Sequence, residues 1–175
     1  MTNILRALFF LLTTISLYAF EDNDCEESIQ FKFDERPWKK AFEDSTENAT
    51  IIEYTLQGET TDNWTELVSL QRLVPIDATP EEYYNEFVKK IKETVTPAQV
   101  DSRVINSSEN SIFFEWSVAK DSHYAQHEWF KLFKTPLSTL VLRYTTKKLN
   151  DVEKERPVWE KILNEATYKK SGPCP

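Results

Sequence analysis

The clearest pattern of hydrophobic and polar positions lies at residues 79–95, where apolar residues recur at helical spacing. Thr79 and Glu82 have the spacing of a capping box, and Pro80 occupies the first helical position, where its missing N–H costs nothing. The pattern predicts a helix that ends before Pro97 and buries one apolar stripe against a sheet. The stripe consists of Tyr84, Phe87, Val88, Ile91 and Val95.

Short runs typical of β-strands flank this helix on both sides. Residues 36–42 are predicted as a helical turn or a loop, and residues 151–166 as a second helix that kinks at Pro157 or restarts at Arg156. Because most strands follow one another through short turns, the sheet is expected to be mainly antiparallel. The predicted fold class is α+β, a mainly antiparallel β-sheet packed by two or more α-helices. The predicted strands are residues 29–33, 51–56, 64–73, 99–105, 111–118, 124–133 and 138–146.

The order of these elements resembles the Mog1/PsbP-like fold, a group that includes small exported bacterial proteins similar to DcrB. The resemblance covers most of residues 29–167 and includes the stretches Asn-Trp-Thr-Glu-Leu-Val at 63–68 and Thr-Pro-Glu-Glu-Tyr at 79–83. It involves no diagnostic catalytic motif and carries over no site residue. The resemblance implies a non-enzymatic binding or accessory module.

Residues 1–19 have the pattern of a secretory signal peptide. A charged start ends at Arg6, an apolar run follows, and the small residue Ala19 precedes an acidic segment. The apolar run is too short to span a membrane. We expect cleavage after Ala19, which leaves residues 20–175 as a single domain in a secreted or periplasmic protein with no stable membrane anchor.

The two cysteines of the chain, Cys25 and Cys174, lie near the two ends of this domain. In an exported protein, two cysteines and no third indicate a disulfide bond. Closing so long a loop would stabilise the fold by about 5 kcal/mol in the chain-entropy account. The alternative is two unpaired surface thiols.

Charge and glycine content exclude several classes of ligand. The formal net charge of −8 opposes binding to nucleic acid or anionic lipid, which depends on clustered Lys and Arg. Only two glycines are present, Gly58 and Gly172, so the dinucleotide fingerprint, the P-loop and the Gly-x-Ser-x-Gly elbow cannot be formed. We therefore predict no cofactor.

The only histidines, His123 and His127, are the candidate metal ligands. On a helix they would share a face and could bind zinc, whereas on a strand they would be roughly 13 Å apart, too far for one ion. The residues that follow His127 alternate as a strand does. We therefore expect no metal site.

Alternation along the second half of the chain divides the predicted sheet into an apolar face under the helices and a mixed face. Aromatic and Arg side chains dominate binding energies at interfaces, so the mixed face is a possible binding surface. Its centre is expected at Trp129, with Arg143 and Glu115 beside it. The five residues proposed for this surface are Phe113, Glu115, His127, Trp129 and Arg143.

Two alternatives remain open for this face. It could be a half-solvated sheet face with cross-strand pairs such as Glu115 with Arg143. Alternatively, Trp38 or Phe42 could cover Trp129, which would then be a core residue.

The sequence as a whole favours an exported non-catalytic binding or accessory protein, whose ligand is a protein or a small molecule. One alternative is a small hydrolase that uses carboxylates in a cleft of the sheet. The other is an extracytoplasmic effector or inhibitor that acts on another protein. Buried paired acids in a closed pocket would favour the enzyme, and a shallow apolar or aromatic face would favour the binding protein.

Overall fold

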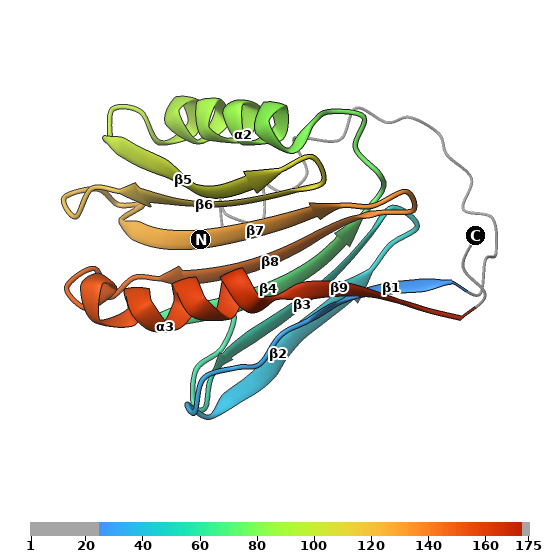
Figure 1. Ribbon diagram of the computed structural model, residues 1–175. Coiled ribbons are helices and arrows are strands. Elements are labelled where there is room, and N and C mark those ends of the chain that lie inside the picture. The colour runs from blue at the N-terminus through green and yellow to red at the C-terminus, as the bar shows by residue number, and fades with distance from the viewer. Residues whose placement is uncertain (1–24, 173–175) are drawn as a thin grey trace.

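The computed structural model describes residues 25–172 as a seven-stranded antiparallel sheet, two helices and a two-stranded ribbon (Figure 1). The helices are α2 (Pro80–Val95) and α3 (Val152–Glu165), and the ribbon pairs β1 (Glu26–Gln30) with β9 (Thr167–Ser171). The order of strands in the main sheet is β2-β3-β4-β8-β7-β6-β5. The predicted α+β class is confirmed. The main-sheet strands are β2 (Trp38–Ser45), β3 (Ala49–Leu56), β4 (Glu66–Leu73), β5 (Val100–Ser108), β6 (Ser111–Val118), β7 (Gln126–Lys134) and β8 (Thr139–Thr146).

Helix α2 forms as its sequence predicts. The backbone N–H of Glu82 donates to Thr79 Oγ1 at 3.2 Å, and the backbone N–H of Thr79 donates to the Glu82 carboxylate at 2.8 Å. These two bonds satisfy N–H groups that would otherwise lack partners at the start of the helix. The buried stripe of α2 packs against Phe114 of β6 and Phe130 of β7. The capping box and the apolar stripe are both confirmed.

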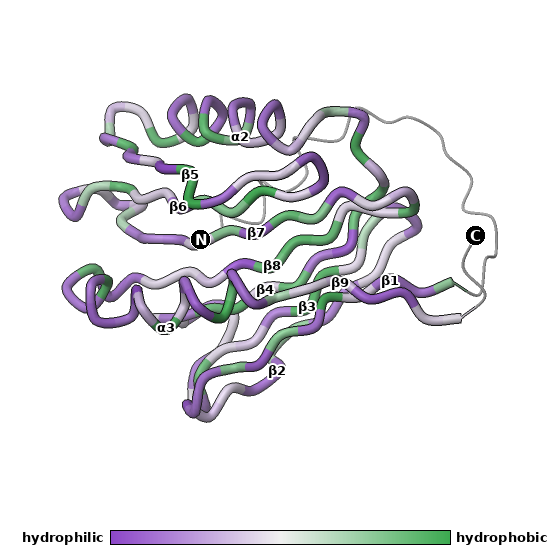
Figure 2. Tube along the Cα trace, viewed as in Figure 1, coloured by the Kyte–Doolittle hydropathy of each residue, from purple (hydrophilic) through white to green (hydrophobic). Residues whose placement is uncertain are grey.

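The two helices lie on opposite faces of the sheet, which the sequence did not predict. Helix α2 packs over β5, β6 and β7, whereas α3 packs over β7 and β8 on Trp129 and Tyr144. Because neighbouring residues of a strand point to opposite faces, Trp129 and Phe130 belong to different layers. In Figure 2 hydrophobic segments follow the central strands β7 and β8, nearly all of whose residues are buried. The prediction of one solvated mixed face is therefore wrong.

Three local predictions also differ from the structure. Residues 36–42, predicted as a helical turn or a loop, contribute to β2. The first predicted strand lies a few residues earlier, as β1, and pairs with β9, an element that the sequence did not predict. Helix α3 runs from Val152 to Glu165 with Pro157 inside it, so it does not restart at Arg156.

The ribbon of β1 and β9 brings the two ends of the described chain together. Glu26 lies opposite Ser171, which places Cys25 beside the last described residues. Cys174 lies outside the described residues, and the disulfide stays a prediction that this register supports. We expect mass spectrometry of the non-reduced protein to find Cys25 and Cys174 in one linked peptide pair, and we expect reductant to lower the melting temperature. Two alkylatable thiols would contradict the pairing.

The predicted signal peptide, residues 1–19, also lies outside the described residues. No helix within residues 25–172 is long and apolar enough to cross a membrane.

Candidate functional site

The structure buries all five residues of the predicted binding surface. The exposed fraction is 0% for Trp129 and does not exceed 8% for Phe113, Glu115, His127 and Arg143. Glu115 lies opposite Trp129 across β6 and β7, with His127 on the same face. Arg143 lies opposite Phe130 and therefore faces α2, on the other side of the sheet. The predictions of an exposed surface centred on Trp129 and of a Glu115–Arg143 pair are both wrong.

Helix α3 covers Trp129. The Trp129 ring stacks beside Tyr144 with centroids 5.6 Å apart, and Tyr144 stacks on Trp159 of α3 at 3.8 Å. The guanidinium carbon of Arg156, also on α3, lies 5.6 Å from the centre of the Trp129 ring. Trp38 of β2 contacts Trp159 edge-on rather than covering Trp129 itself. Trp129 is thus a core residue, as one alternative held, but α3 provides the cover.

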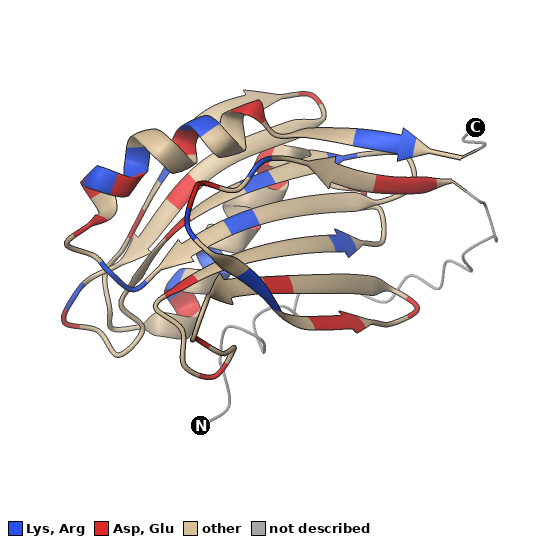
Figure 3. Cartoon of the chain, turned by 90° about the horizontal axis from the view of Figure 1, so that it is seen from below, with Lys and Arg blue, Asp and Glu red and all other residues tan. Residues whose placement is uncertain are grey.

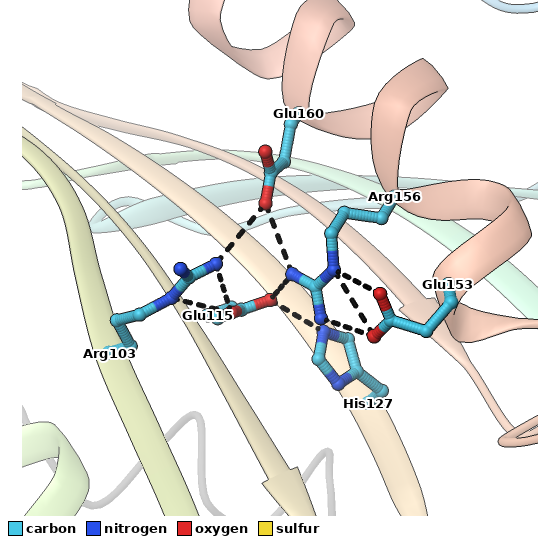
Figure 4. A network of polar contacts seen from close by, with 6 residues as sticks. All are labelled: Arg103, Glu115, His127, Glu153, Arg156 and Glu160. Carbon is cyan, nitrogen blue, oxygen red and sulfur yellow. Dashed lines mark hydrogen bonds and ion pairs between the residues drawn. The ribbon is translucent and has the colours of Figure 1, made fainter.

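Glu115 lies at the centre of a polar network that ties α3 to the sheet (Figure 4). Its Oε2 is 3.0 Å from His127 Nε2 and also accepts a hydrogen bond from Arg156 Nη1. Its Oε1 accepts a hydrogen bond from Arg103 Nε of β5 at 2.9 Å. A single carboxylate therefore joins β5, β6, β7 and α3.

Two acids of α3 complete the network around Arg156. Arg156 Nη2 pairs with Glu153 at 2.9 Å, and Arg156 Nη1 pairs with Glu160 at 3.1 Å. Basic and acidic positions are interleaved along α3, the helix that leads into β9 (Figure 3). Arg103 and Arg156, the two arginines of the network, are therefore each paired with at least one carboxylate of this chain.

The contacts of Glu115 fix its charge. Burial raises the pKa of the carboxyl, but hydrogen bonds from His127 and Arg156 outweigh burial and lower the pKa from 4.5 to about 2. The group is therefore ionised at neutral pH and holds no proton to donate as a general acid.

This pKa predicts how stability depends on pH. The folded state favours the ionised carboxylate, so its stabilisation is complete above the unfolded pKa, near 4.5, and is lost as the pH falls toward about 2. We expect Glu115→Gln to be less stable than the wild type at neutral pH, and the difference in unfolding free energy to shrink as the pH falls between these two values. Urea unfolding across this range measures the difference. A difference that stays constant with pH would contradict this account.

Glu66 of β4 anchors a second buried cluster on the same face. Its carboxylate accepts hydrogen bonds from Tyr144 Oη at 2.7 Å and from Lys148 Nζ at 2.6 Å, and it also pairs with Arg36. Burial raises the pKa of Glu66, but hydrogen bonds from Lys148 and Tyr144 outweigh burial and hold it below its usual value. Arg36 in turn lies over the ring of Trp38 at 5.3 Å. This cluster joins the segment before β2 to the core.

Glu128 forms a third buried pair on the face that α2 covers. It accepts hydrogen bonds from Arg143 Nε at 2.9 Å and from Arg143 Nη2 at 2.7 Å. Trp116 Nε1 and Thr145 Oγ1 each donate to it at 2.9 Å. With four donors and no exposed surface, the carboxylate has no capacity left for a substrate.

The described residues offer no metal centre. No group of three or more His, Cys, Asp or Glu within residues 25–172 is placed to hold a metal ion. His127 lies in β7 and is bound to Glu115, whereas His123 lies in the turn that precedes β7.

Two concave surfaces of the described chain are shallow, and none of the five predicted residues lines either of them. One groove, of about 420 Å³, lies between α2 and the edge strand β5 and is lined mainly by α2, including Tyr84 and Lys92, and by Ser102 of β5. A second pocket of about 400 Å³ lies between the turn before β7 and the start of α3, with Lys120 and Lys147 in its wall. These two concave surfaces therefore lie at one edge and at one end of the sheet.

Sequence reasoning missed Arg156 and Glu128, although each carries a readable signal. Arg156 lies three residues before Trp159 and seven before Leu163, which places it on the buried stripe of α3. Glu128 lies two residues before Phe130, so strand alternation places this acid on an apolar face. A charged residue at a core position is the signal for a buried ion pair.

Comparison with solved structures supports the fold that the sequence resemblance implied. The chain is similar to the solution structure of cyanobacterial PsbP (CyanoP) from Synechocystis sp. PCC 6803, with a TM-score of 0.56 and 7% sequence identity. The alignment covers 89% of this chain and 99% of that one. At this identity the likeness establishes the fold alone.

Comparison with curated protein sequences gave no match. A protein-family model matches residues 27–168, which include nearly all of the described fold. The chain therefore belongs to the family that this model defines, and its fold is PsbP-like.

Proposed function

We propose that the protein is an exported, non-catalytic binding or accessory protein. The observation that supports this most strongly is the pairing of three of the five buried glutamates of the described chain. Glu115, Glu66 and Glu128 are each bound by basic side chains of the same chain. A carboxylate hydrolase needs a carboxylic acid whose pKa is raised so that it can donate a proton. Glu115 and Glu66 have lowered pKa values instead.

Two further features are consistent with this proposal. The signal-peptide pattern of residues 1–19 and the pair Cys25 and Cys174 suit an exported protein. As part of the same proposal, we infer that the chain is similar to small exported bacterial proteins of the DcrB type. An effector or inhibitor acting on another protein would also work by binding and would leave the buried pairs unchanged.

Capture of partners by the exported form, residues 20–175, tests this proposal. We expect a partner from the extracytoplasmic fraction to bind saturably once it is purified, and we expect no turnover of ester, glycoside or phosphoester substrates. Turnover that disappears in Glu115→Gln or Glu66→Gln would overturn the proposal in favour of the hydrolase.

Export itself has a direct test. We expect the exported protein to begin at Phe20, because Ala19 is the last small residue before the acidic segment. N-terminal sequencing of protein recovered outside the cytoplasm measures this. An intact Met1 on that protein would contradict the predicted cleavage.

A further inference from the structure

We propose that the open edge of β5, together with the groove between β5 and α2, binds an extended peptide segment of a partner as an added strand. This inference rests on the proposed binding function and names where the partner docks. In β-strand addition, backbone hydrogen bonds provide affinity and pockets for alternate side chains provide specificity.

The backbone of β5 is arranged to accept such a strand. The N–H of Ala119 donates to the carbonyl of Gln99 at 3.2 Å, which fixes the phase of the ladder between β5 and β6. Hydrogen-bonded and non-hydrogen-bonded pairs alternate in an antiparallel ladder. Val100, Ser102 and Val104 therefore turn their N–H and C=O groups away from β6. Within residues 25–172, β5 pairs with β6 alone, so these groups lie on the open edge.

The side chains of these same three residues face the helix layer. Val100 packs against the core cluster under α2, and the hydroxyl groups of Ser102 and Tyr84 are hydrogen-bonded at 3.0 Å. Val104 is 40% exposed, and few large hydrophobic residues of the described chain are as exposed as this one. An added strand would direct every second side chain toward the same groove, at a spacing of about 7 Å. Tyr84 and Val88 give this groove an apolar wall.

Charge indicates what kind of peptide fits. Lys89 and Lys92 line the groove with a single acid, Glu93, so this site is locally basic on a chain of net charge −8. Lys89 Nζ also lies 3.8 Å from Glu86, but both side chains are exposed and this pair is therefore weak. Acidic side chains on the peptide would pair with the two lysines. The occupant is thus an extended segment whose alternate, groove-facing side chains include both apolar and acidic residues.

The opposite edge of the sheet differs from β5. Lys39, Lys40 and Glu43 place charges along the edge strand β2, and the register shifts between Lys40 and Phe42. Charged side chains and bulges are devices that block pairing at an edge strand. β5 also carries charges, at Asp101 and Arg103, but these lie on the face away from α2. Its only register shift lies after Val104, so residues 100–104 keep regular strand geometry.

The edge variant Ser102→Pro removes one outward N–H without removing a hydrogen bond between β5 and β6. Its matched control is Ser102→Ala, which keeps the N–H and loses only the hydroxyl contact with Tyr84. Charge is tested separately with the double variant Lys89→Glu and Lys92→Glu. Lys161→Glu on α3, where the lysine side chain is 72% exposed, is the control for a lysine-to-glutamate change far from the groove.

The probe is a synthetic peptide selected from a random peptide display library on residues 20–175. We expect the wild type, Ser102→Ala and Lys161→Glu to bind it alike. We expect Ser102→Pro and the double lysine variant each to weaken binding about tenfold, a loss of about 1.4 kcal/mol. Bound peptide should slow amide hydrogen exchange at Val100, Ser102 and Val104.

Four results would overturn the inference. The first is that a folded Ser102→Pro protein binds the peptide as tightly as the wild type does, and the second is that the peptide slows amide exchange elsewhere than in β5. The third is that the library yields no peptide that binds the wild type better than it binds Ser102→Pro. The fourth is that this chain forms a dimer that Ser102→Pro dissociates. If Ser102→Pro does not fold, the inference is tested by the double lysine variant and by the hydrogen-exchange pattern. Unchanged binding by the double lysine variant, or no protection at Val100, Ser102 and Val104, would then overturn it. If Ser102→Pro still binds the natural partner, only this docking surface fails. Enzymatic turnover would instead mean that the proposed function fails.

Discussion

Replacing Trp129 by alanine is expected to lower the free energy of unfolding by about 3–5 kcal/mol. The ring has no exposed surface and is enclosed by Tyr144, His127 and Arg156. Truncation would remove this packing and leave a cavity between the sheet and α3, because close-packed neighbours relax only in part. Urea or thermal unfolding measures the loss.

Trp129→Phe is the matched control. It keeps an aromatic ring in the stack and removes an indole N–H for which the described chain provides no acceptor, so its cost should be much smaller. A loss below about 1 kcal/mol in Trp129→Ala, together with loss of partner binding, would restore the idea of an exposed anchor. We expect Trp129→Phe to bind the partner as the wild type does.

Replacing Glu128 by glutamine should destabilise the protein by about 3–5 kcal/mol, the usual cost of removing one partner from a buried ion pair. Glutamine keeps the shape of the side chain but removes the charge that binds the guanidinium of Arg143 through two hydrogen bonds, so that Glu53 is the acid that still interacts with it. It also weakens the hydrogen bonds from Trp116 and Thr145. The unfolding free energy at neutral pH is the measurement.

A double variant separates the ion pair from the packing around it. Glu128→Leu combined with Arg143→Met removes both charges, and buried ion pairs replaced by apolar residues often lose little stability. We expect the double variant to be more stable than either single variant, with a large coupling energy in the cycle. Single variants that each stay within about 1 kcal/mol of the wild type would show that the pair is not buried as described.

Elements with a complete local signal could be predicted from the sequence. Helix α2 has a capping box, a proline at its first position and one continuous apolar stripe, and it forms as predicted. Strand β6 alternates along residues 111–118, and its bounds agree with the prediction. In both, local pattern and tertiary packing favour the same structure.

The sequence does not show which residues of β8 point to which face of the sheet, because apolar and polar residues do not alternate along this strand. Leu140, Val141 and Leu142 are all apolar and all buried, since helices cover the central strands on both faces. A shift of one residue in a strand moves every side chain to the other face. The prediction assigned the side chains of β8 to the wrong faces in this way and placed Arg143 beside Glu115. In the structure Arg143 pairs with Glu128 instead.

The strands β2 and β9 were missed for a different reason. β2 is a charged edge strand, and β9 is a short exposed strand whose partner, β1, lies at the other end of the chain. Such strands are defined by long-range pairing and not by local hydrophobic pattern. The groove beside β5 was missed in the same way, because it exists only where α2 meets an edge strand.

The central claim is that the buried polar network is structural and that binding occurs at the β5 edge. The most direct test compares the affinity of the purified partner for folded Glu115→Gln and folded Ser102→Pro at neutral pH. We predict that Glu115→Gln binds like the wild type, despite its lower stability, and that Ser102→Pro binds about tenfold more weakly. Loss of binding in Glu115→Gln with full binding in Ser102→Pro would contradict the account.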